Sequence, residues 1–405
     1  MLLFHHARGE QDIGNLDPGS WCTSKPWLAE TNRASAFALI ETAWITSWRK
    51  RKGLAVRSAI LSIAAVAESL GCETTVFDLN RRFFEFSDAV GEAGIDGFAE
   101  SAAREIAKRE ADVYGFGSIC SGYPLTLRIA GRVKAIHPEA TVLLGGPQAS
   151  VVAQPTLASF PFVDFVLRGE SEASLPIFLE ELSGEHNFDR VPGLTHRSIW
   201  GIRQNADAPP IADLDDLPMP AYHLTGELHG AEQASLELGR GCPFACTFCS
   251  TNDFFRRKFR LRSPERVLQD MRAIEGEYGI REFILTHDMF TVDAKRVRAF
   301  CHHMIASGTN YRWSCSARTD SVDRELLELM AEAGCTGVFF GVETGSERMQ
   351  KIIDKHLDTN RAHQIIDIVR PSTTPSASLS GVATKRPRLR FVDQRDHHLP
   401  IITQD

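Results

Sequence analysis

The sequence predicts an α/β protein built from two successive regions in which strands and helices alternate. Three observations support this fold class. Apolar runs of the strand type alternate with helical periods before residue 186, the same alternation returns after residue 234, and a stretch rich in Pro and Asp lies between the two regions. Alternation at this pitch favours parallel sheets covered by helices. We therefore divide the chain into a segment without a clear period (1–35), a first domain (36–185), a linker (186–233), a second domain (234–370) and a tail (371–405).

The first domain is expected to begin with a short buried strand, "AFALI", centred on 37–40. The next stretch, "VRSAILSIAAVAESLG" (56–71), has apolar residues at helical spacing and ends at Gly71, a typical helix stop. Further strands are expected at 73–79, 112–118, 141–146 and 162–169, and further helices at about 95–109, at about 124–136 and after the last two strands. Ligands of such sheets bind beyond the carboxyl ends of the strands. These ends are Asp78, Gly117-Ser118, Gly145-Gly146-Pro147 and Arg168-Gly169-Glu170.

The linker contains "APPIADLDDLPMPAY" (208–222), which has little periodicity and is typical of an extended connection. The second domain is expected to contain strands at 235–240, 281–288, 311–318 and 336–344, and helices at 263–279, 293–308, 323–334, 346–354 and 358–369. Ser263 and Asp293 are placed to cap two of these helices, with Glu265 in the first turn of one and Gly308 ending the other. Four consecutive strand–helix units favour a barrel or part of one, with its chemistry at the carboxyl ends of the strands. The tail has the composition of a disordered segment.

The composition excludes several classes of protein. A net charge of −7 gives no electrostatic reason to expect a nucleic-acid partner. No apolar run approaches the roughly 18 residues of a membrane helix, and the N-terminal sequence lacks the features of a secretory signal. We therefore expect a cytoplasmic protein without a membrane partner.

Three of the nine cysteines, Cys242, Cys246 and Cys249, are spaced C-x3-C-x2-C in "ELGRGCPFACTFCS". The other six are expected to be small buried thiols. A structural zinc ion needs four ligands, commonly from two C-x2-C pairs, and the sequence has no second pair. The sequence Cys301-His302-His303 could supply a fourth ligand, but it lies inside a predicted helix. A cluster of four irons also needs four ligands, so three cysteines leave one iron open.

This cysteine loop closely resembles that of the radical S-adenosylmethionine (SAM) enzymes. The Gly-Arg-Gly-Cys approach and Phe248, the aromatic residue before the last cysteine, fit the family pattern. The resemblance implies that the three cysteines hold a [4Fe-4S] cluster, that the open iron binds the amino and carboxylate groups of SAM, and that Phe248 lies beside SAM. It further implies an electron donor, such as a flavodoxin or ferredoxin, and release of a 5′-deoxyadenosyl radical.

The resemblance extends over about 235–357. "GVFFGVETGSERMQKIIDK" is similar to the family segment in which a Glu after an apolar strand contacts SAM, which implies this contact for Glu343. "WSCSARTDSVDRELLELMAEAGC" and "FILTHDMFTVD" are similar to the two preceding units and imply that Arg318 and Asp288 lie near SAM. The alternative is that these three are surface ion-pair partners at strand ends.

The order of a parallel-sheet domain, a linker and a radical domain resembles the cobalamin (B12)-binding radical SAM proteins. The resemblance implies an N-terminal Rossmann-like cobalamin domain followed by a partial (β/α) radical SAM barrel. "SICSGYP", "VLLGGPQAS" and "VDFVLRGESE" are the motifs that carry it. Cobalamin would then contact Ser118, Ser121, Gly145 and Gly146. The alternative is that the glycines serve tight turns only.

Two departures from the family pattern affect these expectations. Asn80 stands where some cobalamin domains have a His ligand to cobalt, so that ligand is absent. The family barrel has six strand–helix units, of which four are recognised here, so we expect a C-terminally truncated, incomplete barrel with an exposed edge.

We expect an enzyme that methylates an unactivated carbon or phosphorus of a small molecule in a biosynthetic pathway, or catalyses a related radical rearrangement or cyclisation. Two alternatives remain open. One is a cobalamin-independent radical SAM enzyme of the methylthiotransferase type, although the cysteines of the first part of the chain are scattered (Cys22, Cys72 and Cys120). The other is a non-catalytic, metal-binding or truncated remnant.

Overall fold

The structure, a computed structural model, describes residues 36–41, 58–79, 82–83, 94–225, 228–369 and 390–391. The expectations for the segment 1–35, for Asn80 and for all of the tail except residues 390–391 fall outside these residues.

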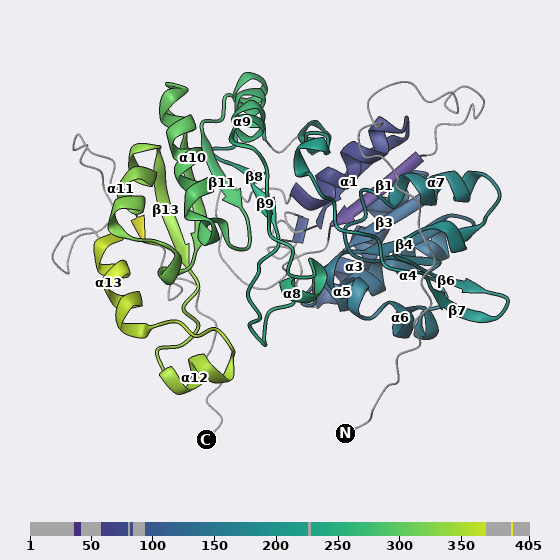
Figure 1. Ribbon diagram of the computed structural model, residues 1–405. Coiled ribbons are helices and arrows are strands. Elements are labelled where there is room, and N and C mark those ends of the chain that lie inside the picture. The colour runs from purple at the N-terminus through teal and green to yellow at the C-terminus, as the bar shows by residue number, and fades with distance from the viewer. Residues whose placement is uncertain are drawn as a thin grey trace. The chain divides into compact units, whose positions relative to one another are not determined.

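The first domain contains a seven-stranded sheet, here called the front sheet, in the order β2-β1-β3-β4-β5-β6-β7 (Figure 1). Its strands are β1 (Ala36–Glu41), β2 (Glu73–Asp78), β3 (Val113–Gly117), β4 (Thr141–Gly145), β5 (Phe165–Leu167), β6 (Leu194–Ser198) and β7 (Gly201–Gln204). Strands β1 to β5 are parallel, so their carboxyl ends meet at one edge. The five strands expected from the sequence are confirmed, although β5 is shorter than expected.

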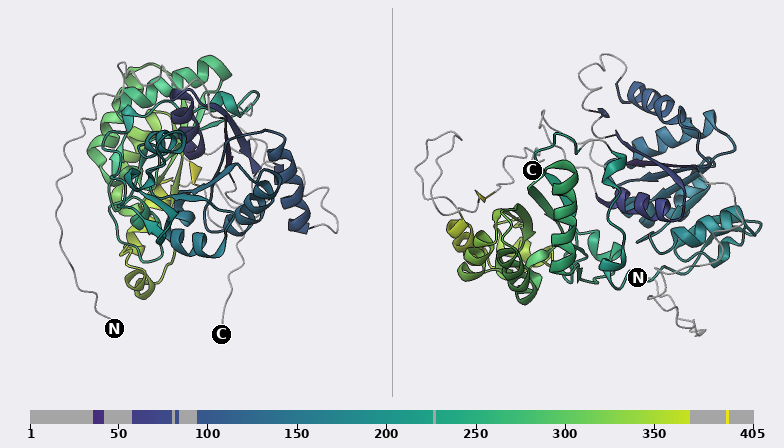
Figure 2. Two further views of the ribbon diagram at one scale, coloured as in Figure 1. Left: turned by 90° about the vertical axis from the view of Figure 1, so that its right-hand side faces the viewer. Right: turned by 90° about the horizontal axis from the view of Figure 1, so that it is seen from above.

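Helices cover both faces of the front sheet because its central strands are apolar on both sides. In β1, Phe37 and Leu39 belong to one hydrophobic cluster, whereas Ala38 and Ile40 belong to a second cluster. Figures 1 and 2 show α1 and α7 on one face of the sheet and α3 and α4 on the other. The helices of this domain are α1 (Ser58–Ser69), α3 (Gly94–Ala107), α4 (Tyr123–Ile136), α5 (Gly146–Val151), α6 (Ala153–Ser159) and α7 (Leu175–Ser183).

The stretch 186–233, expected to be a linker, contains two strands of the front sheet. β6 pairs antiparallel with β5, and β7 pairs antiparallel with β6. The sequence of β6, "LTHRS", lacks apolar alternation although Thr195 is buried. The Thr195 hydroxyl is satisfied inside the protein because it accepts a hydrogen bond from Nε of the buried Arg168 at 3.0 Å. The expectation of an extended linker therefore missed this hairpin.

The second domain contains a parallel sheet, here called the rear sheet, in the order β14-β13-β12-β11-β8. Its strands are β8 (Ala234–Glu237), β11 (Glu282–Thr286), β12 (Arg312–Ala317), β13 (Cys335–Phe340) and β14 (Arg390–Phe391). The four strands expected from the sequence are confirmed, and β14 lies in the expected tail. In the described part of the chain this sheet is open, as a partial barrel requires.

The helices of the second domain are α8 (Thr251–Phe254), α9 (Pro264–Tyr278), α10 (Ala294–Ala306), α11 (Arg324–Glu332), α12 (Glu347–Ile352) and α13 (Thr359–Val369). Both predicted caps are confirmed. The Ser263 side chain accepts a hydrogen bond from the amide of Arg266, and Asp293 accepts from the amides of Lys295 and Arg296.

The two sheets share a hydrophobic core. One cluster contains Leu61 of α1 together with Leu236 of β8 and Trp313 of β12. The amide of Ala221 donates to the carbonyl of Leu61 at 3.0 Å. Among the described residues, no helix combines the length and the apolar character that a membrane crossing needs.

Candidate functional site

The cysteine loop begins directly after a two-residue strand at the carboxyl end of β8. This strand, β9 (Gly239–Arg240), pairs antiparallel with β10 (Arg260–Leu261). The chain turns at Gly241, whose φ is +82°, and a Cβ at this position would lie 2.1 Å from the carbonyl oxygen of Lys258. Only glycine therefore fits between β9 and the first cysteine.

The three cysteines of the loop are free thiols with different exposure. Cys242 is buried, whereas Cys246 and Cys249 are half-buried. Burial raises the pKa of the Cys242 thiol, and nearby Asp288 and the other two cysteines act in the same direction. Metal binding at Cys242 must therefore displace a firmly held proton.

The donor set of the loop fits a multi-iron cluster. Its three thiols are soft ligands of the kind that hold iron–sulfur clusters, and each can bind a different iron. A closed site for a single tetrahedral zinc ion needs a fourth ligand. Among the residues that the structure describes, no three His, Cys, Asp or Glu side chains are grouped as a metal-ion site.

Asp288, at the carboxyl end of β11, holds the two ends of the loop. Its Oδ2 accepts a hydrogen bond from the amide of Gly241 at 3.1 Å, and its Oδ1 accepts from the hydroxyl of Thr251 at 3.2 Å. These two donors lie on either side of the three cysteines. Both carboxylate oxygens are thus already used within the protein, and the expected proximity of Asp288 to SAM remains a prediction.

Arg318, at the carboxyl end of β12, supports the middle of the loop. Its guanidinium carbon lies 3.9 Å from the centroid of the Phe244 ring. The Nε and Nη2 atoms donate to the two carboxylate oxygens of Asp320 at 2.8 and 2.7 Å, and Nη2 also donates to the carbonyl of Lys355. Because Arg318 is buried, these contacts fix its position beside the first two cysteines.

Glu343 lies beyond the carboxyl end of β13. Lys355, which the sequence did not mark as a site residue, connects it to the last part of the cysteine loop. The buried Lys355 donates to Oε1 of Glu343 at 2.8 Å, and its Nζ lies 5.7 Å from the centroid of the Phe248 ring. Glu343 adopts a φ of +65°, which is uncommon for a residue other than glycine. Glu343 and Phe248 are exposed, so a ligand can reach both.

The rear sheet therefore brings three predicted residues to one loop from three neighbouring strands. Asp288 contacts the start of the loop, Arg318 its middle, and Glu343 its end through Lys355. The group combines carboxylates and cations beside three thiols, which suits a ligand that has both an amino and a carboxylate group. The backbone also ties the loop to this edge, since the amide of Thr247 donates to the carbonyl of Ile353 at 3.0 Å.

The predicted cobalamin residues lie at the carboxyl ends of β3 and β4. Gly146 has a φ of +87°, and a Cβ there would lie 2.9 Å from the carbonyl oxygen of Ser118. Gly145 has an ordinary extended conformation, and a Cβ would meet only the Leu167 carbonyl oxygen at 3.6 Å. The packing of two strand ends thus requires glycine at position 146. The same packing does not require glycine at position 145.

The two predicted serines of this edge differ in the burial of their side chains. Ser118 is buried and donates to the carbonyl of Ile119 at 2.9 Å, whereas Ser121 is exposed. Ser150, which we did not single out, donates to the carbonyl of Gly146 at 2.8 Å and accepts from the amide of Gly169 at 3.0 Å. It joins the ends of β4 and β5.

The two candidate sites are neighbours. α5, which begins at Gly146, contacts α8, which begins two residues after Cys249. The helix that follows the glycine turn of the front sheet therefore lies beside the helix that follows the cysteine loop of the rear sheet.

Comparison with known proteins identifies both domains. Residues 236–381 match the family model of the radical SAM superfamily, and residues 49–179 match that of the B12 binding domain. An uncharacterised methyltransferase of Pyrococcus horikoshii is 30% identical over 285 residues, which are 68% of this chain and 61% of the relative. The cytidylyl-2-hydroxyethylphosphonate methyltransferase of Streptomyces wedmorensis is 27% identical over 350 residues, which are 76% of this chain and 65% of the relative. The chain thus spans less than two thirds of either relative's own length.

A solved structure of the cobalamin-dependent SAM radical enzyme OxsB, with aqua-cobalamin and SAM bound, has the same fold. It superposes with a TM-score of 0.65 over 83% of this chain and 47% of that chain, at 18% sequence identity.

Proposed function

Because this chain belongs to the radical SAM proteins that carry a B12-binding domain, we propose that it is an enzyme that transfers a methyl group to a small molecule, or carries out a related radical transformation, with a [4Fe-4S] cluster, SAM and cobalamin. One observation carries the proposal: three strand ends of the rear sheet support the cysteine loop, and the helix that begins at Gly146 of the B12 domain contacts the helix that follows this loop.

Cys242, Cys246 and Cys249 would hold three irons of the cluster and leave the fourth for SAM. When bound, the reduced cluster supplies the electron that cleaves SAM, and cobalamin carries the methyl group. The protein contributes the geometry around these groups. Asp288 fixes the two ends of the cysteine loop, and the planar Arg318 side chain supports the ring of Phe244 in its middle.

SAM would lie on the exposed side of the loop, between Phe248 and Glu343. The carboxylate of Glu343 accepts a hydrogen bond from the amino group of SAM in this proposal, while Lys355 holds the carboxylate in position. Nζ of Lys355 also lies 5.7 Å from the centroid of the Phe248 ring, so Lys355 connects Glu343 to the aromatic residue that would lie beside SAM.

Cobalamin would lie on the carboxyl edge of the front sheet. Gly145 leaves its backbone open to a flat macrocycle, and the exposed hydroxyl of Ser121 is available to a corrin amide. Ser118 and Gly146 shape the turn on which the ring would rest.

We also infer that the electron comes from a flavodoxin or ferredoxin and that the protein is cytoplasmic. The eight described cysteines are free thiols.

The test is anaerobic reconstitution with iron and sulfide, followed by addition of hydroxocobalamin and SAM. Cluster and corrin absorption, with formation of S-adenosylhomocysteine or 5′-deoxyadenosine, are the expected results. A cluster without retained corrin would favour a cobalamin-independent radical enzyme. One zinc and no iron per chain would overturn the proposal.

A further inference from the structure

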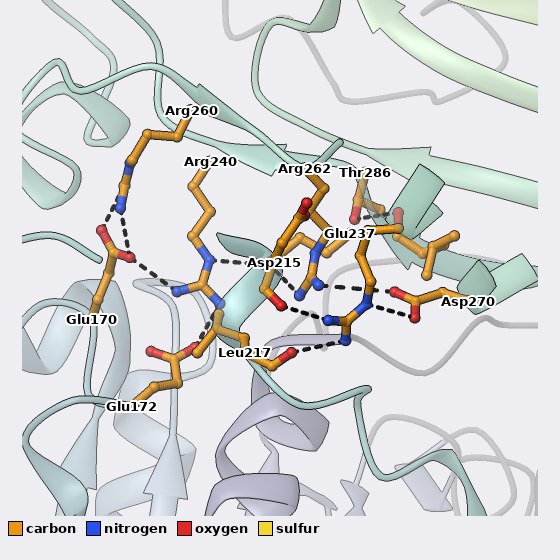
Figure 3. A network of polar contacts seen from close by, with 12 residues as sticks. Glu170, Glu172, Asp215, Leu217, Glu237, Arg240, Arg260, Arg262, Asp270 and Thr286 are labelled. Atoms are coloured by element: carbon orange, nitrogen blue, oxygen red, sulfur yellow. Dashed lines mark hydrogen bonds and ion pairs between the residues drawn. The ribbon is translucent and has the colours of Figure 1, made fainter. Parts of the chain in front are cut away.

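A buried network of charges connects the B12 domain to the cysteine loop. Figure 3 shows its centre, the guanidinium of Arg240, which ends the strand before Gly241 and Cys242. The network also includes carboxylates and arginines from both domains: Glu170, Glu172, Glu237, Arg260, Arg262 and Asp270.

Arg240 has three carboxylate partners, two of which come from the other domain. Nη1 donates to Glu170 at 3.0 Å and Nη2 donates to Glu172 at 2.5 Å, whereas Nε donates to Glu237 of its own domain at 3.0 Å. The side chain of Arg240 is 6% exposed, and those of Glu170 and Glu172 are 3% and 6% exposed. Burial acts to raise the pKa of Glu172, but Arg240 outweighs burial and the pKa is lowered. Glu172 and Arg240 therefore form a buried ion pair, whose geometry is tightly constrained.

Glu170 holds a second strand of the cysteine-loop edge. Both of its carboxylate oxygens accept hydrogen bonds from Arg260 of β10, at 3.0 and 2.6 Å. β10 pairs with β9, and the cysteine loop follows β9. Glu170 and Glu172 therefore bind both strands of this two-stranded ribbon.

A chain of hydrogen bonds leads from Glu170 to the proposed corrin site. Gly169, next to Glu170, donates its amide to Ser150, and Ser150 donates to the carbonyl of Gly146. At the other end, Arg240 is two residues from Cys242. A displacement of Glu170 and Glu172 relative to Arg240 therefore changes the separation of the glycine turn and the cysteine loop.

We propose that Glu170, Glu172 and Arg240 are positioning residues that set the distance and orientation between the cluster and the corrin. The proposal rests on the proposed function, because that function places the two cofactors at these edges. Methyl and electron transfer depend on close, oriented approach, so a small shift has a large kinetic effect.

The experiment compares Glu172→Gln with Asp270→Asn in the reconstituted full chain. Both changes remove a buried carboxylate of the same network, but the carboxylate of Asp270 pairs with Arg262 and Arg266 of its own domain, among the described residues. Four quantities are measured: iron and corrin content, the temperature of unfolding, the broadening of the cob(II)alamin electron paramagnetic resonance signal by the reduced cluster, and the rate of S-adenosylhomocysteine formation with cob(I)alamin as acceptor.

Glu172→Gln is expected to retain iron and corrin but to weaken the magnetic broadening. It should lower the rate about tenfold or more, with the KM for SAM nearly unchanged. Asp270→Asn should lower only the temperature of unfolding. If Glu172→Gln behaves like Asp270→Asn, the network is merely stabilising and the proposal is overturned. Should Glu172→Gln fail to fold, Glu172→Asp, which keeps the charge and shortens its reach, serves in the same comparison.

Failure of the proposed function is recognised separately, because the wild-type chain would then not retain corrin. In that case, calorimetry of the unloaded chain tests only whether Glu170, Glu172 and Arg240 join the two domains. A single unfolding transition in the wild type and two in Glu172→Gln would support this mechanical role, whereas one transition in both chains would overturn it.

Discussion

The guanidinium of Arg318 lies over the ring of Phe244, with its carbon 3.9 Å from the ring centroid, and is held there by both carboxylate oxygens of Asp320. Phe244 stands between the first two cysteines. A residue from the end of β12 thus supports a loop that follows β9.

Arg318→Lys should weaken this support while keeping the charge. Lysine cannot form the paired hydrogen bonds to Asp320 or stack as a plane on Phe244, so we expect the free energy of unfolding to fall by about 1–3 kcal/mol. Urea denaturation of the unloaded chain and iron content after reconstitution measure the effect. Arg324→Lys, in an exposed pair with Glu328, is the control and should change neither quantity.

Asp288→Asn should reduce retention of the cluster. The amide side chain keeps one acceptor and places a donor where Gly241 or Thr251 also donates, so one end of the loop is released. Loss of such a supporting contact typically lowers metal affinity about 10- to 100-fold, measured here by competition with a chelator. Thr251→Val, which removes only one of the two hydrogen bonds, should give a smaller loss. If iron retention is unchanged and only the KM for SAM rises, Asp288 contacts SAM rather than holding the loop.

Lys355→Met should raise the KM for SAM about tenfold. Methionine fills a similar volume but cannot hold Oε1 of Glu343 in position. Glu343→Gln should have a similar effect, and the double variant should be little worse than either single one, because the two residues act as a unit. The KM is obtained from the rate of SAM cleavage at several SAM concentrations. Additive effects would show that Lys355 and Glu343 act independently.

The adjacent glycines Gly145 and Gly146 should respond differently to alanine. Gly146→Ala places a Cβ within 2.9 Å of the Ser118 carbonyl at a positive φ, and should cost about 1–3 kcal/mol of stability. Gly145→Ala meets only an ordinary contact and should leave stability nearly unchanged. If a corrin rests on this turn, Gly145→Ala should nevertheless weaken corrin retention, measured by gel filtration and absorption. Full retention would place the corrin elsewhere.

His287 should make the stability of the chain sensitive to mild acid. Burial lowers the pKa of His287 to about 3, whereas the ordinary value is 6.5. Between these values the unfolded chain binds a proton that the folded chain does not, so this contribution to stability is complete above 6.5 and is lost as the pH falls. The free energy of unfolding of the wild type should drop by about 1.4 kcal/mol relative to His287→Asn between pH 7.5 and 5.5. Asparagine can still accept the amide of Met289, and an identical pH dependence of both chains would contradict the prediction.

Local features of the fold could be predicted from the sequence because their causes are local. Ser263 and Asp293 cap helices within three residues of themselves, and the three cysteines lie within eight residues of one another. The strands of both sheets were likewise predicted, because central strands of the front sheet are continuously apolar and those of the rear sheet alternate. β6 was missed because its buried threonine is paired with an arginine and carries no apolar signal.

The support of the site could not be predicted, because its partners are distant in sequence. Nothing in the neighbourhood of Lys355 marks it as the partner of Glu343, and an isolated lysine in the connection between two helices is usually exposed. Glu172 and Arg240 are 68 residues apart in the sequence. The sequence therefore indicated that Glu172 follows a strand and that Arg240 precedes the cysteine loop, but not that the two residues pair.

The same spacing has a consequence for how the protein is made. Glu170 and Glu172 leave the ribosome 68 to 90 residues before Arg240 and Arg260, an interval on the order of several seconds at usual rates of synthesis. During that interval the two carboxylates have none of these arginines to pair with and must remain hydrated. The front sheet can therefore fold early, but its junction with the cysteine loop closes only after the arginines have been synthesised. Closure of this junction, with the loss of water from its carboxylates, is thus a late step of biogenesis.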